Sequence, residues 1–172
     1  MTRTVNRRAM LLGVILWAPW SGRAWGQEKM VFRCDFDAVT APGSDEGRLV
    51  AGYQGGRSLL VESAEPGTRS RRFAIAPEQL ADRFATLRAV VKAEGVSEPP
   101  KPWNGIKVML VLEMADGSRQ YPQIALPAGT FDWRRMTEAI RLPRGIQKAA
   151  LVVGLEAVSG RVWFDDLEVE FL

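Results

Sequence analysis

Short segments in which apolar and polar residues alternate recur along this 172-residue chain, and this pattern limits the fold more than any other feature. Successive side chains of a β-strand point to opposite faces, so each segment is typical of a half-buried strand. Only residues 77–84 favour a helix, of one or two turns. The pattern predicts an all-β sandwich or barrel with at most one short helix. The expected strands are 31–37, 57–62, 69–76, 85–94, 106–113, 121–126, 129–143, 148–156 and 159–172.

Residues with turn-forming character separate these segments. Glu65-Pro66-Gly67 predicts a turn between the second and third strands, and Ser159-Gly160 predicts a turn into the last one. For residues 129–143 a helix stays the alternative, although the spacing of the apolar residues fits a period of 2 better than 3.6.

Two of the segments define a hairpin and its register. In residues 106–113 the even-numbered positions are all apolar, and the odd-numbered set begins with Lys107 and ends with Glu113. A two-residue turn would mix the faces of the two strands, whereas a three-residue loop, Ala115-Asp116-Gly117 with Gly117 left-handed, keeps them separate. This loop predicts the pairs Leu110–Pro122 and Val108–Ile124, and a polar and aromatic patch on one outward face with Lys107, Glu113, Tyr121 and Gln123.

The closing stretch, 159–172, carries two adjacent carboxylates within a strand pattern. From Trp163 on, the odd-numbered positions are apolar apart from Asp165, and the even-numbered positions from Asp166 to Glu170 are acidic. The alternation predicts that the odd set, up to Phe171, faces the core and that the even set faces water. An inward carboxylate without a partner is costly. Asp165 is therefore expected either to accept hydrogen bonds from backbone N–H groups of a neighbouring loop or to bind a structural Ca²⁺.

The first 26 residues predict an export signal peptide, which is not part of the folded domain. Arg3, Arg7 and Arg8 precede an apolar run, 9–20, that is too short to span a bilayer comfortably. Small residues then suit cleavage before Gln27. The Arg7-Arg8 pair is typical of twin-arginine export, and the general secretory route is the alternative. Either route predicts a periplasmic or secreted protein.

Removal of this signal changes the charge balance. Four of the 23 basic residues and none of the 20 acidic ones lie in residues 1–26, so residues 27–172 carry a net charge of about −1. This balance does not favour a nucleic-acid partner. The length of 27–172 suits a single domain with a substantial core, and no further apolar run is long enough to span a membrane.

Two residue types limit the chemistry. The chain has no histidine, which excludes Ser-His-Asp and Cys-His catalysis and histidine-ligated metals. Its single cysteine, Cys34, permits no intrachain disulfide. A metal ion, if one is bound, is therefore expected to be a hard cation held by oxygen atoms.

Several short stretches follow one another in an order and spacing that match a known superfamily. They are Gly56–Leu59, Trp103–Lys107, Gly129–Trp133, Leu142–Pro143 and Gly160–Asp166. The chain resembles the galactose-binding-like jelly-roll domains, which include carbohydrate-binding modules of secreted glycoside hydrolases. The resemblance implies an antiparallel jelly-roll β-sandwich, often with sugar binding and a structural Ca²⁺ near the joined ends of the first and last strands. Asp165 matches the last-strand aspartate of these domains, and Asp37 lies where a second calcium ligand is expected.

A sugar-binding surface needs an aromatic face under the apolar side of the sugar ring and polar groups near its hydroxyls. Trp103, followed by Asn104 in a proline-rich loop, is the candidate platform, and its alternative role is to anchor that loop. Trp133 and Trp163 favour packing roles. The hydroxyl-binding candidates are Lys107, Tyr121, Gln123 and, on the next strand, Arg135.

The two carboxylates of the closing strand do not predict a glycosidase. Asp165 and Asp166 are neighbours in a strand, point to opposite faces and cannot flank one glycosidic bond. The sequence therefore predicts a non-catalytic protein similar to a carbohydrate-binding module. The alternative is a structural or partner-binding β-sandwich of the cell envelope that binds no sugar. A solvent-exposed Trp103 beside an outward Tyr121 favours sugar binding, and a large apolar patch favours a protein partner.

Overall fold

The structure is a computed structural model that describes residues 30–38, 47–77, 80 and 84–171. The predicted signal peptide and most of the helical candidate 77–84 lie outside these residues, as does the side chain of Phe171. In the described part, no helix is long and apolar enough to cross a membrane. The elements are β1 (Met30–Cys34), β2 (Arg48–Ala51), the 3-10 turn η2 (Tyr53–Gly55), β3 (Arg57–Ile75), β4 (Phe84–Val96), β5 (Gly105–Met114), β6 (Arg119–Gln120), β7 (Gly129–Arg141) and β8 (Ile146–Phe171).

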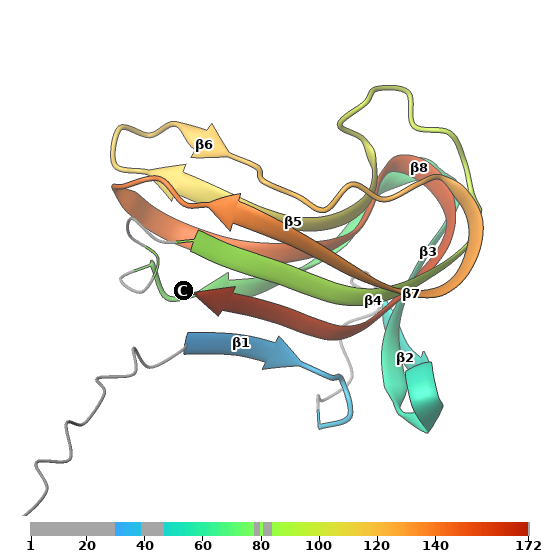
Figure 1. Cartoon of the computed structure of the whole chain (residues 1–172). Helices are drawn as coiled ribbons and strands as arrows, with labels where there is room; N and C mark the ends of the chain where they lie inside the picture. Colours follow the sequence, from blue (N-terminus) through green and yellow to red (C-terminus); the bar gives the residue numbers. More distant parts are fainter. Residues whose placement is uncertain (1–29, 39–46, 78–79, 81–83, 172) are drawn as a thin grey trace, which may run out of the picture.

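The strands form two layers that share the long strands β3 and β8 (Figure 1). The first half of β8 pairs with β5 and with the second half of β3, and β6 extends this layer beyond β5. The second half of β8 pairs with β4, β1 and the first half of β3, and β7 and β2 lie outside β4 and β3. Every pairing is antiparallel, which confirms the predicted all-β, antiparallel sandwich.

Two of the predicted turns are wrong, because the chain bends there without leaving the sheet. The Glu65-Pro66-Gly67 stretch is an irregularity inside β3: the register against β8 shifts between Ser63 and Gly67 and again between Gly67 and Arg69. The strand β8 continues through Ser159-Gly160 and changes direction where Ala157 and Gly160 have φ values of 56° and 121°. The two strands bend together, so their hydrogen bonding resumes beyond the bend.

A glycine lets β3 and β8 approach closely next to this bend. Gly154 has a φ of 153°, and a Cβ atom at that position would lie 2.2 Å from the carbonyl oxygen of Arg69 and 2.6 Å from the Cα of Ser70. A larger residue at 154 must push these two backbones apart. The layer that carries β5 and β6 therefore depends on glycine at this crossing.

The predicted register of the hairpin and its three-residue loop are confirmed, but the strand expected at 121–126 is wrong. The strand β6 is Arg119–Gln120, and beyond it only Gln123 forms an isolated bridge, to Met109. Gly117 is left-handed, with a φ of 81°. The Leu110 N–H donates to the Pro122 carbonyl at 2.9 Å, and the Ile124 N–H donates to the Val108 carbonyl at 3.0 Å. Residues 129–141 form strand β7 and not the alternative helix.

The predicted alternation along the closing strand is wrong for Trp163 and Phe164, whereas Asp165 is buried as predicted. Phe164 is fully buried, whereas Trp163 is only half-buried and lies on the outer face. An extra residue in β8 causes the change. Arg88 pairs with Glu168 and Val90 pairs with Asp165, so one residue of β4 lies opposite two residues of β8 between these pairs. Asp166, one of the two, has a positive φ of 43°. Such a β-bulge shifts the side-chain alternation by one position.

The core fills the space between the two layers. The even positions of β5 face it, as predicted, and are at most 8 % exposed. Buried residues of β3, β4 and β8 belong to the same core cluster. Fully buried large side chains include Leu59, Leu87, Leu110, Leu112, Leu151, Leu155, Phe164 and Leu167.

Candidate functional site

A groove crosses the outer face of the layer formed by β6, β5, β8 and β3. Its first chamber has a volume of about 480 Å³ and is lined by Trp103, Lys107, Met109, Tyr121, Gln123 and Glu156. A second chamber of about 320 Å³ shares four of these residues and continues across β8 to Ser70 and Arg72 of β3. The two chambers form one continuous depression, which we call the groove. Four of the predicted sugar-binding residues are thus brought together.

Two aromatic side chains stand exposed at the first chamber. Trp103 is 59 % exposed and Tyr121 is 53 % exposed, and with Phe84 they are the exposed large hydrophobic side chains in the described residues. The Nζ atom of Lys101 lies 5.2 Å from the centroid of the Trp103 ring, a cation–π contact that restrains the ring. Trp103 therefore does not serve as a buried loop anchor, and its ring is available to a ligand.

Lys107 differs from its predicted role as an outward, hydroxyl-binding residue. It is only 3 % exposed. Its ammonium group donates to the Trp103 carbonyl and to Gln123 Oε1 at 3.0 Å, and it forms an ion pair with Glu156 Oε2 at 3.0 Å. An ammonium group has three N–H donors, so these three acceptors use all of them. Lys107 thus holds Trp103, Gln123 and Glu156 in place beneath the groove and has no donor left for a sugar.

Glu156 was missed by the sequence prediction and connects the Trp103 loop to the sheet. Besides its ion pair with Lys107, it accepts a hydrogen bond from the Asn104 Nδ2 atom at 3.2 Å. The Asn104 N–H donates to the Lys101 carbonyl at 2.9 Å, which closes a turn before β5. Glu156 stands opposite Gly105 in the β5–β8 register. The sequence feature that could have identified Glu156 is a charged residue at the end of an otherwise apolar strand.

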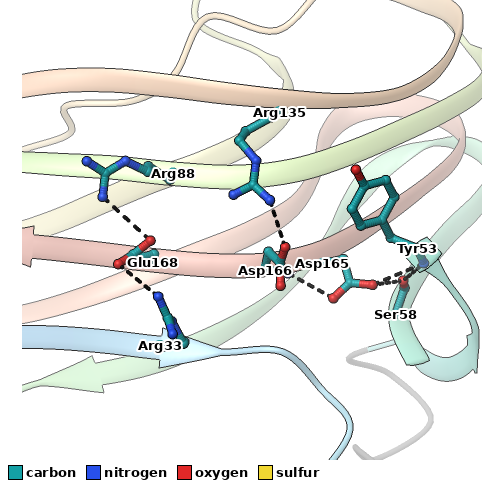
Figure 2. A network of polar contacts seen from close by, with 8 residues as sticks. All are labelled: Arg33, Tyr53, Ser58, Arg88, Arg135, Asp165, Asp166 and Glu168. Atoms are coloured by element: carbon teal, nitrogen blue, oxygen red, sulfur yellow. Dashed lines mark hydrogen bonds and ion pairs between the residues drawn. The ribbon is translucent and has the colours of Figure 1, made fainter. Parts of the chain in front are cut away.

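Arg135 does not lie in the groove. It is on β7, in the other layer, and its guanidinium pairs with Asp166 Oδ2 at 2.9 Å (Figure 2). The two other tryptophans of interest also lie outside the groove. Trp133 packs on Tyr53 with ring centroids 5.6 Å apart, and the Lys92 Nζ atom lies 5.2 Å from the centroid of the Trp163 ring.

The buried carboxylate of Asp165 is satisfied by protein donors. Its Oδ2 atom accepts from the Ser58 hydroxyl at 2.6 Å and from the Tyr53 N–H at 3.1 Å, and its Oδ1 accepts from the Asp166 N–H at 2.8 Å (Figure 2). This is the hydrogen-bonded alternative predicted from the sequence. Burial raises the pKa of Asp165 above its ordinary value, and the hydrogen bonds from Ser58, Asp166 and Tyr53 oppose that rise.

The donors around Asp37 and Asp165 do not fit a calcium ion held by these two residues. The Arg57 N–H donates to Asp37 Oδ1 at 2.7 Å, and the Arg57 guanidinium donates to the Asp37 carbonyl, so a positive charge already lies there. In the ranges that the structure describes, no three His, Cys, Asp or Glu side chains gather as metal ligands. The calcium prediction stays a prediction, and an unfolding temperature raised by Ca²⁺ over EGTA would support it.

Comparisons with known proteins place the fold. No family model and no curated protein sequence matches the chain. Among solved structures, the chain is similar to the CBM22-1 xylan-binding domain of Xyn10C from Paenibacillus barcinonensis, with a TM-score of 0.60 and 15 % identity over 81 % of this chain and 92 % of that one. A second CBM22 xylan-binding domain is similar with a TM-score of 0.61 and 16 % identity over 80 % of this chain and 92 % of that one.

A third similar structure is the C-terminal family 22 carbohydrate-binding module of Clostridium thermocellum Xyn10B. Its TM-score is 0.57, with 18 % identity over 80 % of this chain and 91 % of that one. At these identities the likeness establishes the fold alone. The chain has the galactose-binding-like jelly-roll fold that these carbohydrate-binding modules share, which confirms the resemblance seen in the sequence.

Proposed function

We propose that the protein is an exported, non-catalytic carbohydrate-binding module that holds a glycan chain in the groove. The observation that carries this proposal is the joint exposure of Trp103 and Tyr121 at one polar-lined depression. Aromatic faces stack against the apolar side of sugar rings, and Gln123 and Glu156 are placed to meet hydroxyl groups. The xylan-binding function named for the similar structures supports a β-linked polysaccharide as the first ligand to test.

The shape of this surface favours sugar over the alternative, an envelope protein partner. A protein-docking site on a monomer is expected to present a contiguous apolar patch of several hundred Å². Here the two exposed aromatic rings line a depression together with Lys107, Gln123 and Glu156. A mixed aromatic and polar lining of this kind is suited to a chain of hydroxylated rings.

The first test is binding of xylo-oligosaccharides to residues 27–172 and to Trp103→Ala, measured by isothermal titration calorimetry. We expect the substitution to weaken binding by about 2 kcal/mol, roughly 30-fold in Kd, because the stacked ring supplies most of the apolar contact. Its effect on the free energy of unfolding should stay near 0.5 kcal/mol, as is usual for an exposed side chain.

Phe84→Ala is the matched control for this test, because Phe84 is 56 % exposed and does not line the groove. It should leave the Kd unchanged. Equal affinity of the wild type and Trp103→Ala would contradict the placement of the ligand. Absence of binding to any member of a glycan array would reject sugar binding and favour the envelope-protein alternative.

Export completes the proposal. It rests on the twin-arginine-like N-terminus, with the general secretory route as the alternative. Mature protein recovered from the periplasm or medium with Gln27 as its first residue would support it. A double Arg7→Lys, Arg8→Lys variant that is still exported would favour the general secretory route.

A further inference from the structure

The groove continues past its second chamber toward the far end of the layer. A third chamber of about 330 Å³ shares Arg72, Val111 and Glu113 with the second one and extends to Lys148 on β8. Its floor is apolar, with Val111 of β5 and Ala150 of β8. The groove therefore runs from Trp103 at one end to Lys148 at the other, and its two ends differ in charge.

At the Trp103 end the charges are balanced within the protein. Lys107 and Glu156 form an ion pair of 3.0 Å, with the Lys107 side chain 4 % exposed. Trp103, Met109, Tyr121 and Gln123, which complete the lining there, are neutral. The charges of the lining thus cancel, and Lys101, whose Nζ atom lies 5.2 Å from the centroid of the Trp103 ring, adds one positive charge beside it. A ligand at this end is contacted mainly by aromatic rings and hydrogen-bonding groups.

At the far end the positive charges exceed the negative ones. Arg72, Arg119 and Lys148 surround one carboxylate, Glu113, which pairs with Lys148 at 3.0 Å and with Arg119 at 3.7 Å. Lys148 lowers the pKa of Glu113, mainly through its hydrogen bond and then through its charge, so Glu113 is ionised at neutral pH. Arg72 is exposed and has no ion pair with any residue that the structure describes. Two positive charges thus remain uncompensated.

We propose that the groove selects a glycan that carries uronic acid residues, with the carboxylate at Arg72 and Arg119 and neutral sugars at Trp103 and Tyr121. A guanidinium group presents its N–H donors in a planar fork that matches a carboxylate, and such charge-assisted pairs are stronger than neutral hydrogen bonds. This inference rests on the proposed function, because it names the ligand class of the same groove.

The test compares a matched ligand pair. Xylo-oligosaccharides that carry glucuronic acid are titrated beside the same preparation after reduction of the carboxyl groups to alcohols, so that only the charge differs. We expect the acidic form to bind about tenfold more tightly at low salt. This preference should shrink as the NaCl concentration rises from about 20 to about 300 mM, because salt ions reach the open groove and screen the attraction between the arginines and the carboxylate.

Arg72→Gln identifies the residue that carries the preference. It should remove most of the tenfold difference, so that the ratio of the two Kd values falls toward one. Arg141→Gln removes the same charge from an exposed position on β7, in the other layer, and should preserve the difference.

The outcomes separate this inference from the proposed function. Equal affinity for both oligosaccharides, with loss of binding in Trp103→Ala, would overturn the acidic-glycan inference and leave the sugar-binding groove intact. Equal effects of Arg72→Gln and Arg141→Gln would show a non-specific charge effect and would also overturn it. No binding of either oligosaccharide, together with a negative glycan array, would reject both.

Discussion

Replacement of Lys107 by Met is expected to lower the free energy of unfolding by about 3 kcal/mol and to weaken glycan binding at least tenfold. Met is unbranched like Lys and only one atom shorter, and it removes the charge. The Glu156 carboxylate then loses its ion-pair partner, and Gln123 Oε1 and the Trp103 carbonyl lose their donor. Removal of one partner of a buried ion pair leaves an uncompensated charge and costs about 3–5 kcal/mol. The lower end applies here because the Glu156 side chain remains 34 % exposed.

Lys148→Met is the control for stability. Its ammonium group also pairs with a carboxylate at 3.0 Å, but the side chain is 75 % exposed, so its loss should cost less than about 1 kcal/mol. Urea unfolding of the two variants and the wild type measures the difference. Equal stability of Lys107→Met and the wild type would contradict the buried network.

A double-mutant cycle tests how Lys107 acts on binding. Its ammonium group holds the Trp103 backbone and has no donor for a sugar, so it is a positioning residue. In Trp103→Ala, the further change Lys107→Met should therefore weaken binding much less than it does in the wild type. Additive effects on the Kd would instead show that Lys107 contacts the ligand directly.

The hairpin that begins with β5 could be predicted from the sequence because its register depends only on residues that are close together in the chain. The period-2 pattern on both strands and a glycine in a three-residue loop define one register, and the structure has it. The outward patch with Tyr121 and Gln123 follows from that register. The burial of Lys107 could not be predicted in the same way, because its covering acceptor, Glu156, comes from a strand 49 positions further along the chain.

The misplaced residues have topological causes. Arg135 follows the groove strands in sequence, but β7 crosses to the other layer and pairs with β4. The bulge in β8 has a signal that strict alternation overlooks: Val162 and Phe164 are apolar at even positions, and Leu167 and Val169 are apolar at odd ones. A switch of parity across Asp165-Asp166 is the pattern that a one-residue bulge produces.

Replacement of Asp165 by Ala should destabilise the protein by about 3 kcal/mol, because it removes the acceptor for a fully buried hydroxyl and for two backbone N–H groups. The Ser58 side chain is 0 % exposed, and its hydroxyl donates to Asp165 at 2.6 Å. Asp166→Asn is the matched control: it changes the adjacent residue, whose ion pair with Arg135 is exposed on both sides, and should cost less than about 1 kcal/mol. Similar losses in the two variants would contradict a special role for Asp165.

The raised pKa of Asp165 also predicts the sign of a pH effect. The native state binds the Asp165 proton more tightly than the unfolded state, for which the ordinary value is 3.8. Its stabilising contribution is therefore complete below pH 3.8 and is lost as the pH rises through the higher native pKa. The stability of the wild type relative to Asp165→Asn, which has no charge to lose, should increase as the pH falls from 7 to 3. Urea unfolding at each pH measures this difference, in which the other carboxylates cancel, and a change of the opposite sign would show that the hydrogen bonds outweigh burial at this site.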